Sequence, residues 1–166
     1  MVIVNAPSSC SSTRKITPAA EAYIFGIIFG WLYCKKNLIK DKKVAIFGLT
    51  FKPGTADFRD SPAMSLGLYL SKAGVEVRAT DPALDQAPKT ARDTFELFTD
   101  PAECAVGSDA VVLATAWSAY QGLNWADISE SMSGDLVVDG RNVLDVGEIK
   151  SAGLRYVGAG RGSVSD

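Results

Sequence analysis

The chain has 166 residues, of which 47% are hydrophobic and 22% are charged, and its formal net charge is -2. This length suits a single domain with a sizeable core, and the lack of a basic excess argues against nucleic acid as a partner. The chain contains no histidine, which removes the commonest general base and metal ligand. Cys10, Cys34 and Cys104 lack the C-x-x-C spacing, so they predict neither a disulfide framework nor a metal site and favour a reducing, cytoplasmic setting.

The first 40 residues differ in composition from the rest of the chain. Residues 1–18 are rich in Ser, Thr and Pro, which predicts a loose or disordered segment. Residues 19–40 contain an uncharged apolar run from Ala22 to Cys34, which predicts an apolar helix that packs on the domain or on a partner subunit. Because a span of the bilayer needs roughly 18–20 apolar residues, this shorter run argues against a membrane role.

A strand, a polar loop and a helix are predicted between Lys42 and residue 73. The apolar run 44–47 ends at Gly48, as in a strand buried on both faces, and Ser61-Pro62 is typical of a helix N-terminus. Loops at the carboxyl ends of such strands bind ligands in open α/β sheets, and two loop cations, Lys52 and Arg59, would suit a phosphate. The alternative is a pair of solvated surface cations, because the loop has neither a G-x-G-x-x-G nor a Walker A pattern.

The rest of the chain alternates between strands and helices. Strands are predicted at 75–79, 95–98, 110–114, 136–138 and 156–157, and helices at 101–106, 125–132 and 148–152, with a loop or short helix over 83–92. This alternation implies crossovers between parallel strands. We therefore predict a Rossmann-like, three-layer α/β/α domain with a mostly parallel sheet, preceded by the N-terminal apolar helix.

The stretch GLTFKPGTADFRDSPA resembles the G-L-x-F-K-x-x-T-x-D-x-R-x-S-P signature of the C-terminal, UDP-binding domain of the UDP-glucose/GDP-mannose dehydrogenase family. Four further matches follow in the family's order: TDPAL at 80–84, VVLATAW at 111–117, VVDGRNVLD at 137–145 and YVGAGRG at 156–162. The resemblance implies that residues 41–163 form a UDP-binding α/β domain. It also implies that residues 19–40 lie where longer members carry the end of a helix from a central dimerisation region.

The resemblance also implies roles for four side chains. Phe51 and Lys52 would contact the nucleotide sugar, with Lys52 at the diphosphate. Arg59 would reach the phosphates of NAD, and Arg141 would be directed at the substrate of a neighbouring subunit. Each has a structural alternative: Phe51 could be a core residue, and either arginine could pair with an aspartate of its own loop. Asp57 is expected to brace its loop rather than to bind a ligand.

The resemblance further implies an oxidation of a UDP-sugar alcohol to a uronic acid in two NAD-dependent steps. The family's catalytic cysteine lies in a G-G-x-C-[FL]-x-K-D motif, and this sequence contains neither that motif nor a G-x-G-x-x-G fingerprint for NAD. Cys10 does not match, and Cys104 lies in a predicted apolar helix, where an inert thiol is expected. We therefore predict no catalytic residue here.

The function predicted from the sequence is the UDP-sugar-binding domain of an NAD-dependent UDP-glucose 6-dehydrogenase-like oxidoreductase. We expect the chain to be inactive by itself, with NAD bound mainly by a domain missing from it. Its expected partners are the UDP-sugar and either further copies of the chain, as a homo-oligomer, or N-terminal domains. The alternatives are a non-catalytic nucleotide-sugar binding or regulatory module and an inactive fragment.

Overall fold

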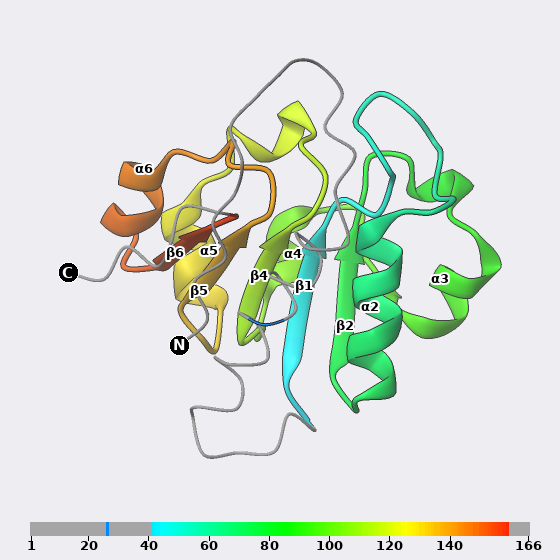
Figure 1. The fold of residues 1–166 in the computed structure, drawn as a ribbon. Coiled ribbons are helices and arrows are strands. Elements are labelled where there is room, and N and C mark those ends of the chain that lie inside the picture. The colour runs from blue at the N-terminus through cyan, green and yellow to red at the C-terminus, as the bar shows by residue number, and fades with distance from the viewer. Residues whose placement is uncertain (1–25, 27–40, 160–166) are drawn as a thin grey trace.

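The computed structural model describes residue 26 and residues 41–159. The predictions of a loose segment over 1–18 and an apolar helix over 19–40 therefore fall outside the described residues, apart from Gly26. The described part forms a six-stranded sheet in the order β3-β2-β1-β4-β5-β6 (Figure 1). Every neighbouring pair in it is parallel, where the sequence predicted a mostly parallel sheet. Each strand is joined to the next by a helical connection. Parallel strands need such a crossover, because the chain must return to the same edge of the sheet before the next strand begins.

The strands are β1 (Lys43–Phe47), β2 (Glu76–Thr80), β3 (Glu96–Leu97), β4 (Ala110–Leu113), β5 (Leu136–Asp139) and β6 (Arg155–Gly158). The helices are α2 (Pro62–Lys72), α3 (Lys89–Thr94), α4 (Pro101–Ala105), α5 (Trp125–Ser131) and α6 (Val146–Ser151), with the short 3₁₀ helices η1 (Leu84–Gln86) and η2 (Ser118–Tyr120). The predicted strands and helices are confirmed to within two residues at each end. The undecided region 83–92 contains η1 and the start of α3.

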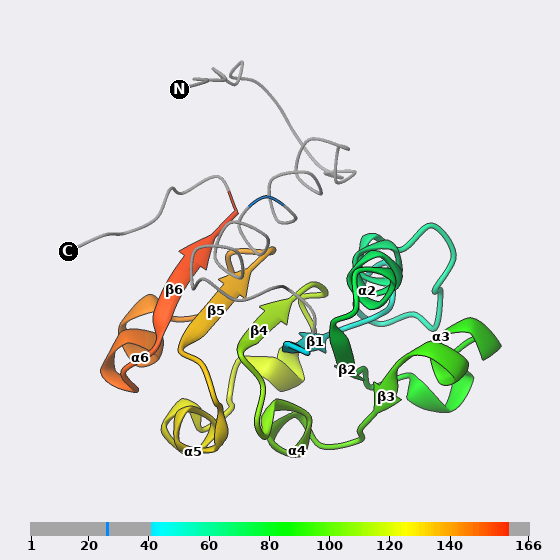
Figure 2. The same ribbon diagram turned by 90° about the horizontal axis from the view of Figure 1, so that it is seen from below.

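Helices cover the sheet in two groups. Helices α2 and α3 lie on one face, over β1, β2 and β3, and helices α4, α5 and α6 lie on the other (Figures 1 and 2). Successive strand residues point to opposite faces, so Val44 and Ile46 pack with α2, whereas Ala45 and Phe47 pack with α4 and α5. None of the helices in the described part is long and apolar enough to cross a membrane.

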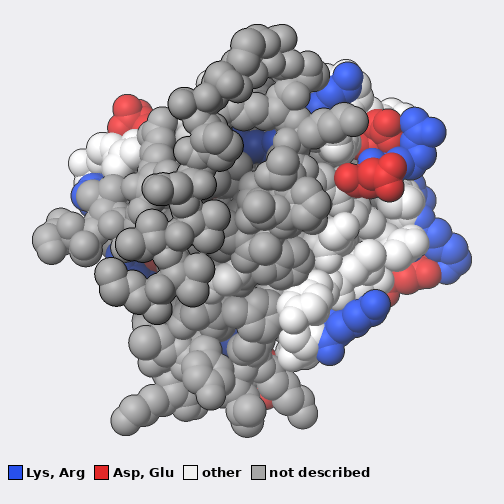
Figure 3. Space-filling view, viewed as in Figure 1, with Lys and Arg blue, Asp and Glu red and all other residues white. Residues whose placement is uncertain are grey.

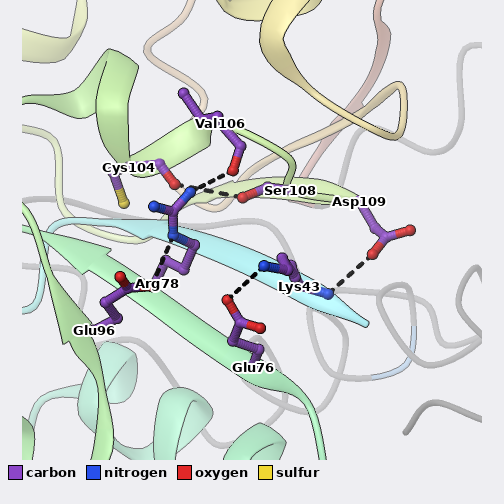
Figure 4. A network of polar contacts seen from close by, with 8 residues as sticks. All are labelled: Lys43, Glu76, Arg78, Glu96, Cys104, Val106, Ser108 and Asp109. Carbon is purple, nitrogen blue, oxygen red and sulfur yellow. Dashed lines mark hydrogen bonds and ion pairs between the residues drawn. The ribbon is translucent and has the colours of Figure 1, made fainter. Parts of the chain in front are cut away.

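Ion pairs tie the starts of the central strands together. The Lys43 ammonium lies 2.9 Å from the Glu76 carboxylate of β2, and the Lys43 backbone N–H donates to Asp109 Oδ2, just before β4, at 2.9 Å (Figure 4). The ammonium of Lys42 pairs with the other Asp109 oxygen, also at 2.9 Å. The three strands are thus aligned in register at the edge opposite their carboxyl ends.

A second cluster fixes α4 on the sheet. Arg78 of β2 pairs with Glu96 at 3.2 Å and donates to the carbonyl of Val106 (Figure 4). Its guanidinium also stacks 4.0 Å above the ring of Phe98. Beside it, Cys104 is fully buried, and burial raises the pKa of its thiol to about 12. The expectation that this thiol is buried is confirmed. Its low reactivity stays a prediction, which the raised pKa supports.

Gly48 allows the chain to turn sharply at the end of β1. Its φ is +91°, a left-handed conformation that favours glycine, and a Cβ at this position would lie 2.4 Å from the Cβ of Thr115. The close approach lets the loop after β1 pack directly against the loop after β4. A side chain at position 48 would force these two loops apart.

We predict that Gly48→Ala destabilises the fold by about 3 kcal/mol, combining left-handed backbone strain with steric overlap. Gly54→Ala is the matched control, because Gly54 has a φ of +77° but open space around its Cβ position. That variant should lose only about 1 kcal/mol. Urea denaturation of both variants measures the difference, and equal losses would show that contact with Thr115 is not the constraint.

Candidate functional site

Three loops meet at the carboxyl edge of the sheet. They follow β1 (residues 48–61), β4 (residues 114–117) and β5 (residues 140–145). The strand order reverses between β1 and β4, where the chain crosses from β3 to the other half of the sheet. In open α/β sheets, ligands bind outside the carboxyl ends of the strands at such a reversal. This edge is therefore the candidate site.

The carboxylate of Asp81 organises the first loop. Asp81 directly follows β2 and is 3% exposed, and its Oδ2 accepts hydrogen bonds from the backbone N–H groups of Leu49 and Thr50 at 2.7 and 2.9 Å. The same oxygen accepts from the Thr50 hydroxyl at 2.9 Å and from Trp117 Nε1 at 3.2 Å. Its other oxygen accepts from the backbone N–H of Ala83 at 2.8 Å. One buried carboxylate thus holds the loops after β1, β2 and β4 together.

Thr50 links the first loop to the loop after β4 a second time. Its carbonyl accepts a hydrogen bond from the hydroxyl of Thr115 at 2.5 Å, and its own hydroxyl accepts from Trp117 Nε1 at 3.0 Å. Both threonines are fully buried. The indole of Trp117 packs against the core cluster on the α4–α6 face and also supports the loop through its N–H.

The carboxylate of Asp139 organises the loop after β5 in the same way. It is fully buried and accepts hydrogen bonds from the backbone N–H groups of Arg141, Val143 and Leu144 at 2.8–2.9 Å. The hydroxyl of Tyr156 on β6 donates to the same carboxylate at 3.1 Å. The backbone from 140 to 144 is therefore wrapped around one buried charge.

The side chain of Arg141 points across the edge towards the other two loops. Its Nε donates to the carbonyl of Ala114 at 2.6 Å, and its Nη2 lies 3.5 Å from the carbonyl of Phe51. No carboxylate among the described residues lies within ion-pair distance of its guanidinium, so the alternative of a pair with a neighbouring aspartate is wrong for the side chain. Burial lowers the pKa of Arg141, because desolvation disfavours the charged form.

Phe51 and Lys52 lie at the outer side of the first loop. Phe51 is 37% exposed, so its alternative as a core residue is wrong, and its backbone N–H donates to the carbonyl of Asp57 at 2.7 Å. Lys52 is exposed, and its ammonium makes no ion pair with any described carboxylate. The structure thus brings Phe51, Lys52 and Arg141 to one edge.

Arg59 is engaged with its own loop instead. Its Nε and Nη2 donate to the two carboxylate oxygens of Asp57 at 2.9 and 3.0 Å, so the predicted loop-bracing role of Asp57 is confirmed. These contacts hold the pKa of the Asp57 carboxyl below its usual value of 3.8. Acidic and basic side chains also alternate over this loop and α3 along the right-hand edge of the face in Figure 3.

A separate open hollow of about 390 Å³ lies between the start of α5 and α6. It is lined by the stretch 121–126 and by Glu148, Ser151 and Ala152. This lining contains an acid and no cation, so it does not suit a phosphate. Across the described residues, no group of three His, Cys, Asp or Glu side chains could hold a metal ion.

The doubly wound fold and its loop-lined carboxyl edge define an α/β domain of the kind that binds nucleotides. Comparison with known families is more specific, since residues 45–146 match the UDP binding domain of the UDP-glucose/GDP-mannose dehydrogenase family. The chain belongs to this family. The match spans the loops after β1, β4 and β5, which form the candidate site.

Relatives and solved structures agree with this assignment. The chain is 40% identical over 124 residues to a UDP-glucose 6-dehydrogenase of Rickettsia conorii, covering 74% of this chain and 29% of that relative. A UDP-glucose dehydrogenase from Pyrobaculum islandicum matches with a TM-score of 0.68 and 28% identity, over 85% of this chain and 29% of that one. An NDP-N-acetyl-D-galactosaminuronic acid dehydrogenase from Methanosarcina mazei matches with a TM-score of 0.76 and 25% identity, over 96% and 34%. The chain thus spans about three tenths of the length of these proteins.

Sequence reasoning missed the two aspartates that organise the edge. It placed Asp81 and Asp139 in motifs but assigned neither of them the loop contacts described above. The available signal was an aspartate at the end of a buried strand, directly before a turn, where a carboxylate can accept hydrogen bonds from the following backbone N–H groups. The bonds from Trp117 and Thr115 to the first loop join residues distant in sequence, and no local pattern indicates them.

We predict that Asp81→Ala loosens the first loop and lowers the stability by about 3 kcal/mol, because several buried donors lose a charged acceptor. Amide hydrogen exchange should become faster at Leu49 and Thr50, which donate directly to Asp81. Asp85→Ala removes an exposed aspartate from the same turn and is the control. Unchanged exchange at Leu49 and Thr50 in Asp81→Ala would contradict the assigned role.

The pair between Asp57 and Arg59 predicts a definite pH dependence. Because the pKa of Asp57 is lowered in the folded state, the pair contributes its stabilisation above about pH 4 and loses it as the pH falls through the folded-state pKa, below 3.8. A carbon-13 NMR titration should give Asp57 a midpoint below 3.8 that rises towards that value in Arg59→Gln. Lys72→Gln, on the far end of α2, should leave it in place. A midpoint insensitive to Arg59→Gln would refute this cause.

Proposed function

We propose that this chain is the UDP-sugar-binding domain of an NAD-dependent UDP-glucose 6-dehydrogenase-type enzyme, and that the diphosphate lies between Lys52 and Arg141. The observation that carries the proposal is that the guanidinium of Arg141 is partly buried and has no carboxylate partner among the described residues. A partly buried guanidinium loses hydration, and backbone carbonyls compensate a cation less well than an anion does. Two of its five N–H donors face carbonyl oxygens, which leaves donors for a phosphate.

Lys52 supplies the second positive charge. Its ammonium has no described carboxylate partner, and it lies on the loop whose Phe51 carbonyl faces Arg141. A flexible ammonium and a planar guanidinium together suit a diphosphate, because both form charge-assisted hydrogen bonds with phosphate oxygens. The partly exposed ring of Phe51 offers an apolar surface for the nucleotide sugar next to these charges.

Arg59 is proposed to reach the phosphates of NAD, as the family resemblance implies. Its side chain is 88% exposed, and only Nε and Nη2 are used by Asp57, so the remaining amino group fits a phosphate while the pair persists. NAD supplies the hydride acceptor when bound. Arg59 is therefore proposed to contribute one contact, and the rest of the NAD site is proposed to lie outside the UDP-binding domain.

Oxidation of a UDP-sugar to a uronic acid is proposed for the whole enzyme rather than for this chain alone. The printed sequence has no G-x-G-x-x-G fingerprint and no G-G-x-C motif, and it spans 29% of the Rickettsia conorii relative. We therefore expect UDP binding without turnover unless N-terminal domains are supplied. The complete enzyme is proposed to act in the cytoplasm, with the domain in a homo-oligomer.

We predict that the chain binds UDP and that Lys52→Ala weakens this binding by about 1.5–3 kcal/mol, the loss expected for a charge-assisted hydrogen bond. Lys72→Ala removes an equal charge from the other end of α2 and should leave the affinity unchanged. Isothermal titration calorimetry with UDP measures both variants, and parallel titrations with GDP and NAD test the choice of nucleotide. Equal affinity of Lys52→Ala and the parent chain would remove Lys52 from the site.

Addition of UDP-glucose and NAD together should produce no NADH absorbance with this chain alone. Turnover by the isolated chain would contradict the proposal that this chain binds the UDP-sugar but needs the rest of the enzyme for oxidation. Binding of none of the three nucleotides would overturn the proposed function itself.

A further inference from the structure

Asn142 directly follows Arg141 in the loop after β5, and its backbone is left-handed, with a φ of +56°. Glycine enters this region freely, and asparagine is one of the few other residues that does so at modest cost. The backbone N–H groups of Arg141 and Val143, on either side of this residue, donate to different oxygens of the Asp139 carboxylate at 2.9 and 2.8 Å. The left-handed turn therefore lies between two hydrogen bonds to one buried carboxylate.

The side chain of Asn142 is anchored at the end of β6, the outermost strand on this side of the sheet (Figure 2). Its Nδ2 donates to the carbonyl of Ala159 at 2.9 Å. Its Oδ1 is buried and has no hydrogen-bond partner in the described part of the chain, and a Cβ on Gly158 would lie only 2.5 Å from it. The amide is thus packed tightly against the backbone of β6.

The left-handed turn does not by itself explain this packing. Glycine would adopt the same φ without burying an amide, and an unpaired buried polar atom costs free energy. The contact with β6 instead fixes the loop at a point next to Arg141. The guanidinium of Arg141 needs such support, because no described carboxylate holds it and its Nη2 lies 3.5 Å from the carbonyl of Phe51, at the outer limit of a hydrogen bond.

We propose that Asn142 is a positioning residue for Arg141. Its amide, held at the end of β6, fixes the loop after β5 so that the guanidinium of Arg141 extends across the carboxyl edge of the sheet. The inference rests on the proposed function, in which Arg141 contacts the diphosphate. Binding groups have to be held within about 0.5 Å of their productive geometry. A loop released from β6 would therefore lose affinity for the diphosphate although Arg141 itself is unchanged.

The first test uses Asn142→Gly, which favours the left-handed turn and removes only the amide. Asp41→Gly is the matched control, because Asp41 also has a positive φ, of +70°, but precedes β1 at the opposite edge of the sheet. In the unliganded chain, Asn142→Gly should shift the nitrogen-15 NMR signal of Arg141 Nε, the atom that donates to the carbonyl of Ala114. Asp41→Gly should leave this signal in place.

A double-mutant cycle, measured by isothermal titration calorimetry with UDP, separates positioning from a general loosening of the fold. Asn142→Gly should weaken UDP binding roughly tenfold, because a misplaced contact group loses much of its interaction. In an Arg141→Ala background the same replacement should have little further effect, since the group that it positions is absent. Equal weakening in both backgrounds, or an unmoved Arg141 Nε signal in Asn142→Gly, would overturn the proposal.

Gly158→Ala tests the same contact from β6. Its Cβ would press on Oδ1 of Asn142, so the Arg141 Nε signal should move as it does in Asn142→Gly. An unmoved signal in a folded Gly158→Ala chain would also overturn the proposal. Because the signal is read without ligand, a parent chain that binds no UDP would overturn the proposed function, while the signal would still decide the positioning role of Asn142.

Discussion

The carboxylate of Asp81 is the interaction on which the candidate site depends. It lies buried at the end of β2, yet its hydrogen-bond partners belong to three separate loops. Taking a carboxylate out of water is costly unless every oxygen finds donors, and here the donors are largely backbone N–H groups that must adopt one conformation to reach it. The backbone of the loop after β1 is therefore held by its bonds to the buried Asp81 carboxylate. The outer side chains Phe51 and Lys52 do not have to make contacts to keep this loop in place. Gly48 makes this possible, because its lack of a side chain lets the loop approach Thr115.

The site divides its charges between two tasks. The buried carboxylates of Asp81 and Asp139 hold the backbone of the loops in place. The cations of these loops, Lys52, Arg59 and Arg141, have few acidic partners among the described residues. Arg59 is the exception, because Asp57 binds it in a bidentate pair. This contrast ranks the three cations for a ligand with two phosphates: Lys52 and Arg141 can gain an anionic partner, whereas Arg59 already has one. In the proposed function, this ranking corresponds to a substrate-binding role for Lys52 and Arg141 and to a contact with NAD for Arg59.

Much of the fold could be predicted from the sequence, because apolar runs and glycine or proline boundaries mark parallel strands and helices locally. The strands predicted at 110–114 and 136–138 were found in this way, and the alternation of strands and helices along the chain implied a mostly parallel sheet. The candidate residues came from a motif resemblance, and the structure places Phe51, Lys52 and Arg141 at one edge. Their surroundings could not be predicted. The partners of Arg141 are carbonyls from loops 27 and 90 positions away, and which carbonyls these are depends on how the strands are ordered in the sheet.

The most direct test of the account is a nitrogen-15 NMR titration of the full chain with UDP. The account predicts that the largest shifts fall on the backbone amides of 50–55 and on the backbone and guanidinium signals of Arg141, while the amides of 121–126 and 148–152 around the separate hollow do not move. Shifts confined to that hollow, or none at saturating UDP, would contradict the assignment of the carboxyl edge as the nucleotide site.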